Sequence, residues 1–378
     1  MSIFLLLLAS VYMAACSVLV FTWRRMPVFQ PANPHPSPSL TVIIPVRNEA
    51  KNLPLLLTDL NAQTYPHFEV IVADDASTDD TVALAQAFPA NYKLQVLTLA
   101  GEPGSSPKKR AIHQAIQRAT GTLLVTTDGD CRVGSEWLCT LAAFHEQTGA
   151  KLISAPVTFL PNNQPVSSWP TRLFANLQTV EFASLIGSGA VTMALDRPSL
   201  CNGANLCYEK SVFEAVGGFA GNEHLASGDD EFLMHKVAAR FPGSVKFLKS
   251  PAAIVRTKPH HDLRSFYQQR RRWASKWRHY RDARVVALAI AVFVLNAAPL
   301  LGLFSWLLDW ISGTVFLVQI LLKFSIEAVF LGQILRFLAQ PKALLFIPLM
   351  QVIYPFYSTF FGLVAQGKGY FWKGRRLE

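Results

Sequence analysis

Apolar positions along this chain follow two different patterns. Between Thr41 and about Ala253, short apolar runs that favour β-structure alternate with stretches in which apolar residues recur every three or four positions. This alternation of strand and helix patterns predicts an α/β fold, with a mainly parallel sheet covered by helices. At both ends of the chain the apolar runs are longer and almost unbroken. We therefore expect transmembrane helices before and after the α/β domain.

The central pattern predicts individual strands and helices. The predicted strands span residues 41–46, 69–73, 94–98, 122–126 and 152–157. The predicted helices span residues 50–63, 106–119 and 209–216. Ser106 is expected to cap the second helix, and Gly217-Gly218 is expected to end the third. No GxGxxG follows any predicted strand, which argues against a dinucleotide-binding Rossmann fold. Gly187-Ser188-Gly189 is expected to be an ordinary loop.

The first long apolar run, residues 3–22, can cross a bilayer once. A cleaved signal peptide, with a lipoprotein site at Cys16, is the alternative interpretation. No basic residue precedes the run, whereas Arg24 and Arg25 follow it, which favours an uncleaved anchor over residues 1–24. The positive-inside rule then places the region after Arg25 in the cytoplasm. Residues 25–39 hold five prolines and are expected to form a stiff linker.

Three further apolar stretches lie near residues 285–307, 311–337 and 343–365. We therefore expect a cytoplasmic α/β domain over residues 40–280, and membrane or interfacial helices with a basic tail over residues 281–378. Three crossings from the cytoplasm would leave the C-terminus outside, whereas the basic tail favours the inside. One stretch is thus expected to lie in the interface. The middle stretch, with Lys323 and Glu327, is the best candidate for irregularity, and the number of crossings stays open.

Composition and charge narrow the class of protein and its location. Of the 378 residues, 51% are hydrophobic, and the formal net charge is +10. Because the basic residues cluster near the apolar segments, membrane lipids and not nucleic acid are the expected partner of this charge. The five cysteines show no CxxC spacing, which argues against a disulfide framework or a zinc site. The expected location is the inner (cytoplasmic) membrane of a cell.

Candidate chemistry gathers where the predicted strands end. Asp128-Gly129-Asp130 follows strand 122–126, and in an extended backbone the two carboxylates point to the same side. Such oxygen ligands suit Mg²⁺ or Mn²⁺, and either ion can hold a diphosphate. Gly129 is expected to let a ligand approach the backbone closely. A polar loop after a strand is the alternative interpretation.

Two further polar clusters follow other predicted strands. Pro45, Arg47 and Glu49 lie at the end of the first strand, and Asp75 follows the second. Ligands of such sheets bind beyond the carboxyl ends of the strands, so the three clusters together favour a ligand site over chance. Asp75 is expected to accept hydrogen bonds from a base or a ribose. The chain has no GxxxxGK[ST] motif, which argues against a P-loop nucleotidase.

Three other charged residues each have a structural and a functional interpretation. Lys108 lies on the inward-facing stripe of helix 106–119, where it either reaches an anionic ligand or extends to the surface. Asp229 and Asp230 open an apolar helix. There they either complement the helix dipole or supply a general base.

A basic segment precedes the C-terminal apolar stretches. Within it, Gln269, Arg272 and Trp273 fall at positions i, i+3 and i+4 and so share one face of a predicted helix. Attraction to the membrane surface is one interpretation of this segment. The other is a binding site, in which the guanidinium contacts phosphate and the indole contacts the face of a sugar.

In this order, the motifs resemble those of the membrane-bound family 2 glycosyltransferases, which have the GT-A fold. The resemblance covers about residues 40–273. The motifs are Pro45-Val46-Arg47-Asn48-Glu49, Asp74-Asp75-x-Ser77-x-Asp79, Asp128-x-Asp130, Asp229-Asp230-x-x-Leu233 and Gln269-x-x-Arg272-Trp273. The chain departs from the family pattern at Asp229, where the family usually has glutamate.

The resemblance implies a nucleotide-sugar donor, a UDP-sugar in the first instance, and a divalent metal, Mg²⁺ or Mn²⁺. Asp75 would bind the base, whereas Asp128 and Asp130 would bind the ribose and the metal diphosphate. The remaining residues implied on the donor side are Pro45, Arg47, Glu49 and Lys108.

The resemblance also implies inverting transfer to a lipid or glycan acceptor at the cytoplasmic face of the membrane. Asp230 would deprotonate the acceptor hydroxyl, although the departure at Asp229 leaves the choice between the two acids open. Gln269, Arg272 and Trp273 would hold the diphosphate and the acceptor end. The alternatives are a processive polysaccharide synthase of the same family and a non-catalytic membrane protein that senses nucleotides or acts as a scaffold.

Overall fold

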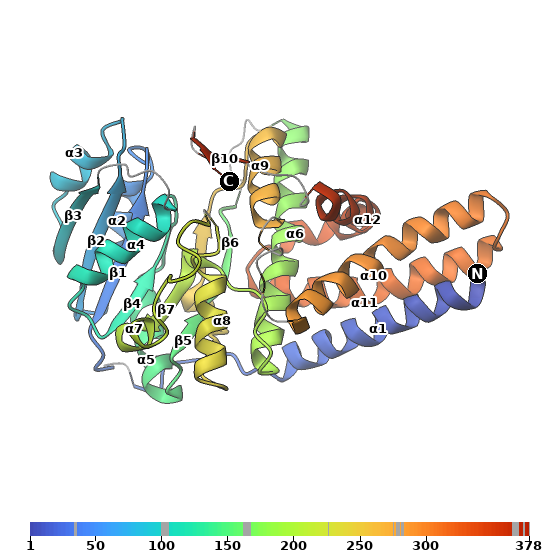
Figure 1. The fold of residues 1–378 in the computed structure, drawn as a ribbon, viewed down its shortest axis with the longest axis horizontal. Coiled ribbons are helices and arrows are strands. Elements are labelled where there is room, and N and C mark those ends of the chain that lie inside the picture. Colours follow the sequence, from blue (N-terminus) through green and yellow to red (C-terminus); the bar gives the residue numbers. More distant parts are fainter. Residues whose placement is uncertain are drawn as a thin grey trace. The chain divides into compact units, whose positions relative to one another are not determined.

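The computed structural model describes residues 1–33, 36–99, 106–161, 168–225, 227–274, 276, 280, 283–364, 370–372 and 375–377. The chain divides into two compact units (Figure 1). The α/β unit comprises Met26–Leu160 and Ser188–Lys258, and the helical unit comprises Met1–Arg25, Pro161–Gly187 and Pro259–Glu378. Two parts of the expected 40–280 domain, the described residues within 161–187 and within 259–280, therefore belong to the helical unit.

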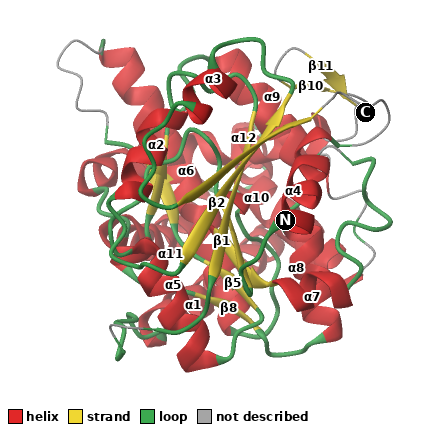
Figure 2. Cartoon of the chain, turned by 90° about the vertical axis from the view of Figure 1, so that its left-hand side faces the viewer, coloured by secondary structure: helices red, strands yellow, loops and turns green. Residues whose placement is uncertain are grey.

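The α/β unit is built on one seven-stranded sheet with the strand order β3-β2-β1-β4-β7-β5-β8. Figure 2 shows the strands, in yellow, as one twisted layer. The strands are β1 (Leu40–Val46), β2 (Phe68–Asp75), β3 (Lys93–Leu99), β4 (Leu123–Thr126), β5 (Leu152–Ser154), β7 (Leu206–Glu209) and β8 (Val245–Phe247). Only β7 pairs with its neighbours in the antiparallel direction. The predicted α/β fold with a mainly parallel sheet is confirmed.

Helices cover this sheet, and their apolar faces form its core. They are α2 (Leu53–Asn61), α3 (Thr81–Gln86), α4 (Pro107–Arg118), α5 (Trp137–Thr148), α7 (Lys210–Ala215) and α8 (Glu231–Arg240). The leucine-rich face of α2 is fully buried, as are Val42, Ile43 and Ile44 of β1. Burial on both faces explains why β1 is a continuous apolar run. Ser106 caps α4 by accepting a hydrogen bond from Lys109 N–H, as predicted.

The predicted strand 152–157 is two separate strands. After β5 the chain leaves the large sheet and continues as β6 (Val157–Phe159), which pairs with β9 (Val255–Thr257) in a second, two-stranded sheet. Pro156 lies at the break and has no N–H to donate to a ladder. Its carbonyl instead accepts hydrogen bonds from Val255 N–H and from the Asn205 amide.

The expectation of a loop at Gly187-Ser188-Gly189 is wrong. These residues lie inside α6 (Trp169–Ala194). A Cβ atom at Gly187 would come within 3 Å of the side chains of Ile334 and Phe330. The glycine therefore allows close helix packing, which offsets its intrinsic cost in a helix of about 1 kcal/mol.

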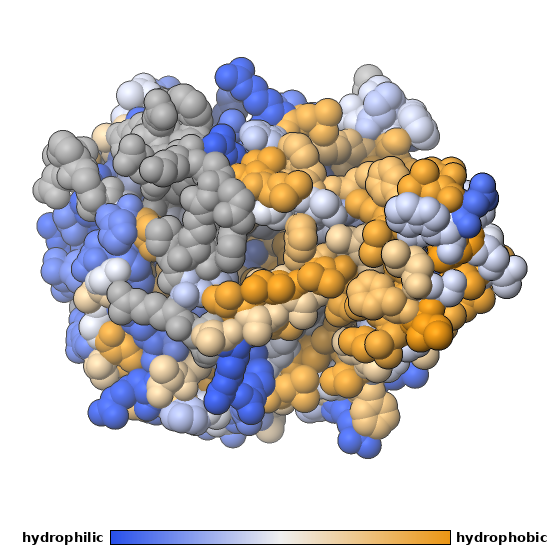
Figure 3. Space-filling model, turned by 45° about the vertical axis from the view of Figure 1, so that its right-hand side comes forward, coloured by the Kyte–Doolittle hydropathy of each residue, from blue (hydrophilic) through white to orange (hydrophobic). Residues whose placement is uncertain are grey.

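Among its described residues, the helical unit holds four helices long and apolar enough to cross a membrane. They are α1 (Ser2–Arg25), α10 (Ala283–Leu307), α11 (Gly313–Phe337) and α12 (Ile347–Val364), the last preceded by the short 3₁₀ helix η4 (Pro341–Phe346). Figure 3 shows apolar side chains gathered on the part of the surface formed by these helices. In Figure 1, α1, α10 and α11 run side by side, whereas α12 is seen nearly end-on and therefore crosses them. The unit also holds α9 (Leu263–Ala274) and a hairpin of β10 (Tyr370–Trp372) and β11 (Arg375–Leu377).

The middle apolar stretch is not irregular, contrary to expectation, because α11 is one continuous helix. Lys323 and Glu327, near the middle of this helix, are buried and paired with each other. Lys323 Nζ also donates to Tyr12 Oη on α1 and to Asn296 Oδ1 on α10, both at 3.1 Å. Intramembrane charges are tolerated where such partners surround them, so Lys323 and Glu327 bind α11 to its neighbours.

The buried carboxylate of Glu69 on β2 links this strand to residues of its neighbours at one edge of the α/β unit. Its oxygens accept hydrogen bonds from Thr41 Oγ1 at 2.8 Å, from Thr120 N–H at 2.6 Å and from Lys93 Nζ at 2.6 Å. Burial alone would raise the pKa of Glu69, but the hydrogen bonds from Lys93, Thr120 and Thr41 outweigh it and lower the pKa to about 2. The ionised form is thus the one that stabilises the fold.

We expect Glu69→Gln to destabilise the folded protein at pH 7 by about 1.5–3 kcal/mol, the range for hydrogen bonds to charged groups. Because the pKa of Glu69 is lower in the folded than in the unfolded chain, this stabilisation is present above the ordinary value of 4.5 and is lost as the pH falls toward about 2. Urea unfolding in detergent at pH 7 and pH 3 measures both effects. Glu214→Gln, at an exposed position, serves as the control. If the free energies of unfolding of wild type and Glu69→Gln differ by the same amount at pH 7 and pH 3, the prediction is contradicted.

Candidate functional site

Three of the predicted polar clusters lie at one edge of the sheet. Arg47 follows β1, Asp75 ends β2, and Asp128 comes two residues after β4. These strands are parallel neighbours in the order β2-β1-β4, so their carboxyl ends meet at the same edge. This edge is where ligands bind in open α/β sheets.

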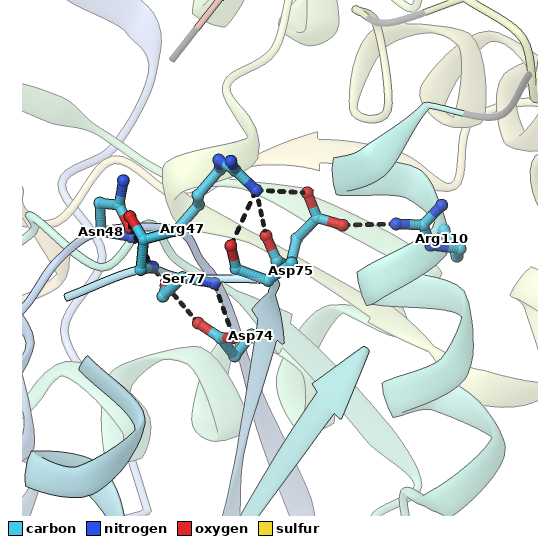
Figure 4. Close-up of polar contacts among 8 residues, drawn as sticks. Arg47, Asn48, Asp74, Asp75, Ser77 and Arg110 are labelled. Atoms are coloured by element: carbon cyan, nitrogen blue, oxygen red, sulfur yellow. Dashed lines mark hydrogen bonds and ion pairs between the residues drawn. The ribbon is translucent and has the colours of Figure 1, made fainter. Parts of the chain in front are cut away.

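The Asp75 carboxylate is buried between two arginines (Figure 4). Arg47 Nη1 lies 3.7 Å from Asp75 Oδ2 and donates to the Asp75 and Ala76 carbonyls at 2.6 and 3.0 Å. Arg110 on α4 forms an ion pair with Asp75 Oδ1 from the other side. The carboxylate is therefore held in a fixed position with its charge compensated.

Sequence reasoning missed Arg110, although the chain contains a signal for it. Lys108, Lys109 and Arg110 all lie in the first turns of α4. Cations at a helix N-terminus oppose the macrodipole, so three in a row indicate that anions lie nearby. Asp75 and Asp128 are those anions in the structure.

The loops after β1 and β2 are joined by hydrogen bonds (Figure 4). Ser77 donates from its N–H and its hydroxyl to the Asp74 carboxylate, and its Oγ accepts from Asn48 N–H at 2.8 Å. Asn48 and Ala76 adopt left-handed backbone conformations, with φ of 54° and 53°. For alanine this costs about 1–2 kcal/mol, and the hydrogen bond from Arg47 to its carbonyl holds it there. Asp74 thus shapes the loop that follows Asp75.

Pro45 and Glu49, expected on the donor side, have clear structural partners. Pro45 pairs with Ala73 within the sheet. Glu49 accepts a side-chain hydrogen bond from Asn52 at 2.7 Å, and its carbonyl accepts from Leu53 N–H at the start of α2. Both residues fix the turn that carries Arg47, and direct contact with a donor stays a prediction.

Asp128 and Asp130 occupy the loop after β4. The Asp128 side chain is 40% exposed, and Asp130 Oδ2 accepts from Thr257 Oγ1 at 3.2 Å. A Cβ atom at Gly129 would lie 2.8 Å from Val46 Cγ1. The absence of a side chain there therefore serves packing against β1, and the close approach of a ligand stays a prediction.

Two carboxylates without further protein ligands fit a particular class of cation. Within the described residues, no group of three or more His, Cys, Asp or Glu side chains surrounds a common point. Mg²⁺ and similar ions are commonly held by one or two carboxylates, with substrate phosphates and water completing the shell. Asp128 and Asp130 fit such an ion, whereas they do not form a closed structural metal site.

Lys108 joins the loop after β4 to the loop before α8. Its Nζ lies 2.9 Å from Asp128 Oδ1 and 3.3 Å from Asp229 Oδ2. Burial alone would lower the pKa of Lys108, but the carboxylates of Asp128, Asp229 and Asp230 outweigh it and raise the pKa. The ammonium is therefore firmly charged and lies among carboxylates of the protein, whereas its contact with an anionic ligand stays a prediction.

Asp229 and Asp230 have different surroundings. Asp229 faces Lys108, whereas Asp230 caps α8 by accepting from Glu231 N–H at 2.7 Å and also accepts from Gly203 N–H at 2.9 Å. A Cβ atom at Gly203 would lie 3.1 Å from Asp229 Oδ2. Gly203 begins the short 3₁₀ helix η1 (Gly203–Asn205) and supplies both a donor and the space that the two acids need.

Gln269, Arg272 and Trp273 belong to α9 in the helical unit, whereas the acidic cluster belongs to the α/β unit. Trp273 stacks on Phe182 of α6, with 6.2 Å between ring centroids. Their neighbour Arg270, which sequence reasoning passed over, is buried and forms an ion pair with Glu181 of α6. We call the side of α9 that carries Gln269, Arg272 and Trp273 the motif face. It is fixed to α6 by the stacking of Trp273 and by Arg270, which lies outside the motif.

Two family models match the chain. The model for glycosyl transferase family 2 matches residues 41–195, and the model for glycosyl transferase family group 2 matches residues 123–361, more than half of the chain. The two matches together include the loops that carry Arg47, Asp75 and Asp128, the acids before α8, and α9.

Individual relatives support the same family. The glycosyltransferase AglE of Haloferax volcanii is 31% identical over 196 residues, which cover 51% of this chain and 59% of that protein. The poly(ribitol-phosphate) beta-N-acetylglucosaminyltransferase TarS of Staphylococcus aureus is 33% identical over 109 residues, covering 28% of this chain and 19% of TarS. The matched part of the chain therefore spans a little over half of the first relative and a fifth of the second.

A solved structure shares the fold. The mannosyltransferase PcManGT from Pyrobaculum calidifontis, in complex with GDP-Man and Mn²⁺, superposes with a TM-score of 0.56 over 96% of this chain and 100% of its own. The two sequences are 19% identical. The GT-A fold predicted for this chain is thereby confirmed.

Proposed function

The chain belongs to glycosyl transferase family 2 and is a glycosyltransferase, and from this premise we propose its reaction. It transfers a sugar from a nucleotide-sugar donor to a lipid or glycan acceptor, with inversion at the anomeric carbon. The cluster of Lys108, Asp128 and Asp229 beside Asp230 carries this proposal. Such a cluster can hold a diphosphate next to a general base. Membership of this family argues against the hypothesis of a non-catalytic scaffold. A processive polysaccharide synthase of the same family stays the alternative function.

We propose that Asp75 receives the base of the donor nucleotide. Its carboxylate is fixed by Arg47 and Arg110, so it can accept an N–H of the base without first having to become ordered. PcManGT binds GDP-Man, which supports a nucleotide sugar as the donor class. UDP stays our first expectation for the nucleotide.

Asp128 and Asp130 would hold Mg²⁺ or Mn²⁺, and that ion would offset the negative charge of the donor diphosphate and of the departing nucleotide. The presence of Mn²⁺ in PcManGT supports this class of ion. Lys108 contributes a permanent positive charge at the same place, since it already contacts Asp128. When a diphosphate binds, the ammonium can turn from the carboxylate to a phosphate oxygen without crossing the site.

Asp230 is the proposed general base. It removes the proton of the acceptor hydroxyl while that oxygen attacks the anomeric carbon from the face opposite the nucleotide. The backbone donors of Glu231 and Gly203 fix the orientation of its carboxylate. Asp229 keeps Lys108 in place and is the alternative base.

We propose that the helical unit anchors the enzyme and contributes to the acceptor side. Gln269, Arg272 and Trp273 of α9 would contact the diphosphate and the acceptor. We retain residues 1–24 as an anchor, 25–39 as a linker and 40–280 as the catalytic domain on the cytoplasmic face. Because α12 crosses its neighbours, three crossings by α1, α10 and α11 with α12 in the interface would place the basic tail inside.

The metal proposal is tested by replacing its two ligands. We expect Asp128→Asn and Asp130→Asn each to weaken the Mn²⁺-dependent binding of nucleotide diphosphate by roughly 10–100-fold or more, as for other losses at metal sites. Calorimetric titration of UDP and GDP at increasing Mn²⁺ and Mg²⁺ measures this effect, and transfer from UDP- and GDP-sugars by purified membranes identifies the donor. Asp196→Asn, on the surface, removes the same charge as a control. Metal titrations unchanged in both ligand variants would refute the assignment.

A further inference from the structure

The helical unit contains a groove between the C-terminal ends of α1 and α11, with a volume of about 440 Å³. We call it the α1–α11 groove. Arg24, Gln333 and Arg336 line its polar side, whereas Val329, Leu344 and Ile347 line its apolar side. We propose that this groove binds the phosphate headgroup of an anionic membrane phospholipid, a role beyond sugar transfer.

The two arginines lie at the same end of the helical bundle. Tyr12 of α1 contacts Lys323 of α11, and further along both helices Trp23 packs against Phe337 with ring centroids 5.2 Å apart. The two helices therefore run parallel, and both end at this groove. In a helix pair that crosses a bilayer, that end lies at the level of the lipid headgroups.

Neither arginine is neutralised by the protein. Among the described residues, no acidic side chain forms an ion pair with Arg24 or Arg336, and both side chains are exposed. The neighbouring Arg25 differs, since its guanidinium lies over the ring of Phe21 at 4.0 Å. Two unpaired guanidinium groups at one groove complement a phosphate, whose oxygens they can bind in pairs.

Gln333 gives independent support for a polar ligand. The amide nitrogen and oxygen of its side chain are both shielded from solvent and, within the part of the chain that is described, both have no hydrogen-bond partner. Buried amide groups that lack a hydrogen-bond partner are costly, and native proteins rarely retain them without a bound partner. A headgroup seated between the arginines offers oxygens and hydroxyls to both amide atoms.

The apolar side of the groove distinguishes a lipid from free phosphate. Val329 on α11, Leu344 on η4 and Ile347 on α12 provide a surface along which an acyl chain can lie. A soluble anion would gain nothing from this wall, whereas a phospholipid buries its chain there. Basic pockets between membrane helices are known to hold anionic headgroups for this reason.

Native mass spectrometry of the full chain in detergent tests the proposal, with phosphatidylglycerol, phosphatidylcholine and inorganic phosphate as probes. We expect phosphatidylglycerol to bind most tightly. Arg24→Gln and Arg336→Gln should each weaken it by about fivefold, the effect of one basic residue near a charged membrane. Gln333→Leu, which leaves the charge unchanged, should weaken it as well.

Arg25→Gln is the matched control, because it removes the same charge from the next residue, outside the groove. If this variant weakens phosphatidylglycerol as much as Arg24→Gln does, diffuse surface charge explains the binding and the proposal fails. Equal affinity for phosphatidylcholine, or full competition by inorganic phosphate at the lipid's own concentration, would also overturn it. Weaker binding of phosphatidylglycerol in the three groove variants, with the wild-type affinity retained in Arg25→Gln, would support it.

Discussion

Asp230→Asn is expected to lower sugar transfer by about 10²–10⁴-fold, the usual contribution of a general base, with little change in nucleotide binding. Asparagine can still cap α8 and accept the hydrogen bond from Gly203 N–H, so the fold of the loop should survive. It cannot take a proton from the acceptor. Steady-state transfer by the purified enzyme, together with calorimetric binding of the nucleotide diphosphate, separates the two effects.

Asp229→Asn is the informative companion variant. Asp229 faces Lys108 at 3.3 Å, so its loss should free the ammonium and change the affinity for the donor more than the rate of the chemical step. If Asp229→Asn instead abolishes turnover at saturating donor while Asp230→Asn stays active, the base is Asp229. That result would reverse the assignment that the family resemblance implies.

Local patterns in the sequence predict the α/β unit well. The prediction of the strand at residues 41–46 depends on a continuous apolar run, and that of the helix at 106–119 depends on apolar periodicity and on the capping residue Ser106. The prediction that the polar clusters lie at one edge of the sheet follows from the fold class alone, because the carboxyl ends of parallel strands meet at the same edge. Arg47, Asp75 and Asp128 lie where this rule puts them.

Contacts between distant segments could not be predicted in the same way. The ion pair of Arg110 with Asp75 joins residues 35 positions apart, and that of Arg270 with Glu181 joins residues 89 positions apart. No pattern along the chain identifies the partner of either arginine, because the three cations at the start of α4 indicate only that some anion lies nearby, and Arg270 alone resembles an ordinary surface charge. The prediction of a loop at Gly187 fails for the same reason, since the close contact of this residue with Ile334 exists only in the folded helices.

Arg270→Met is expected to destabilise the helical unit by about 3–5 kcal/mol, the cost of leaving a buried charge without its partner. Both members of the pair are only 3% exposed, and Glu181 Oε1 also accepts from Tyr357 Oη at 2.9 Å. Without Arg270, Glu181 would keep one hydrogen bond but no positive charge. Arg270 also lies over the ring of Trp273 at 4.4 Å, so the substitution should loosen the motif face of α9.

The double variant Glu181→Leu/Arg270→Met distinguishes stability from function. Removing both charges avoids the uncompensated carboxylate, so much of the lost stability should return. Thermal unfolding in detergent measures this, with the exposed Arg264→Met on the same helix as the control. Transfer should stay low in the double variant, because Trp273 still lacks the guanidinium beside it, whereas nucleotide binding by the α/β unit should match the wild type. If transfer recovers fully along with stability, Arg270 supports the fold of α9 only and does not position Gln269, Arg272 and Trp273.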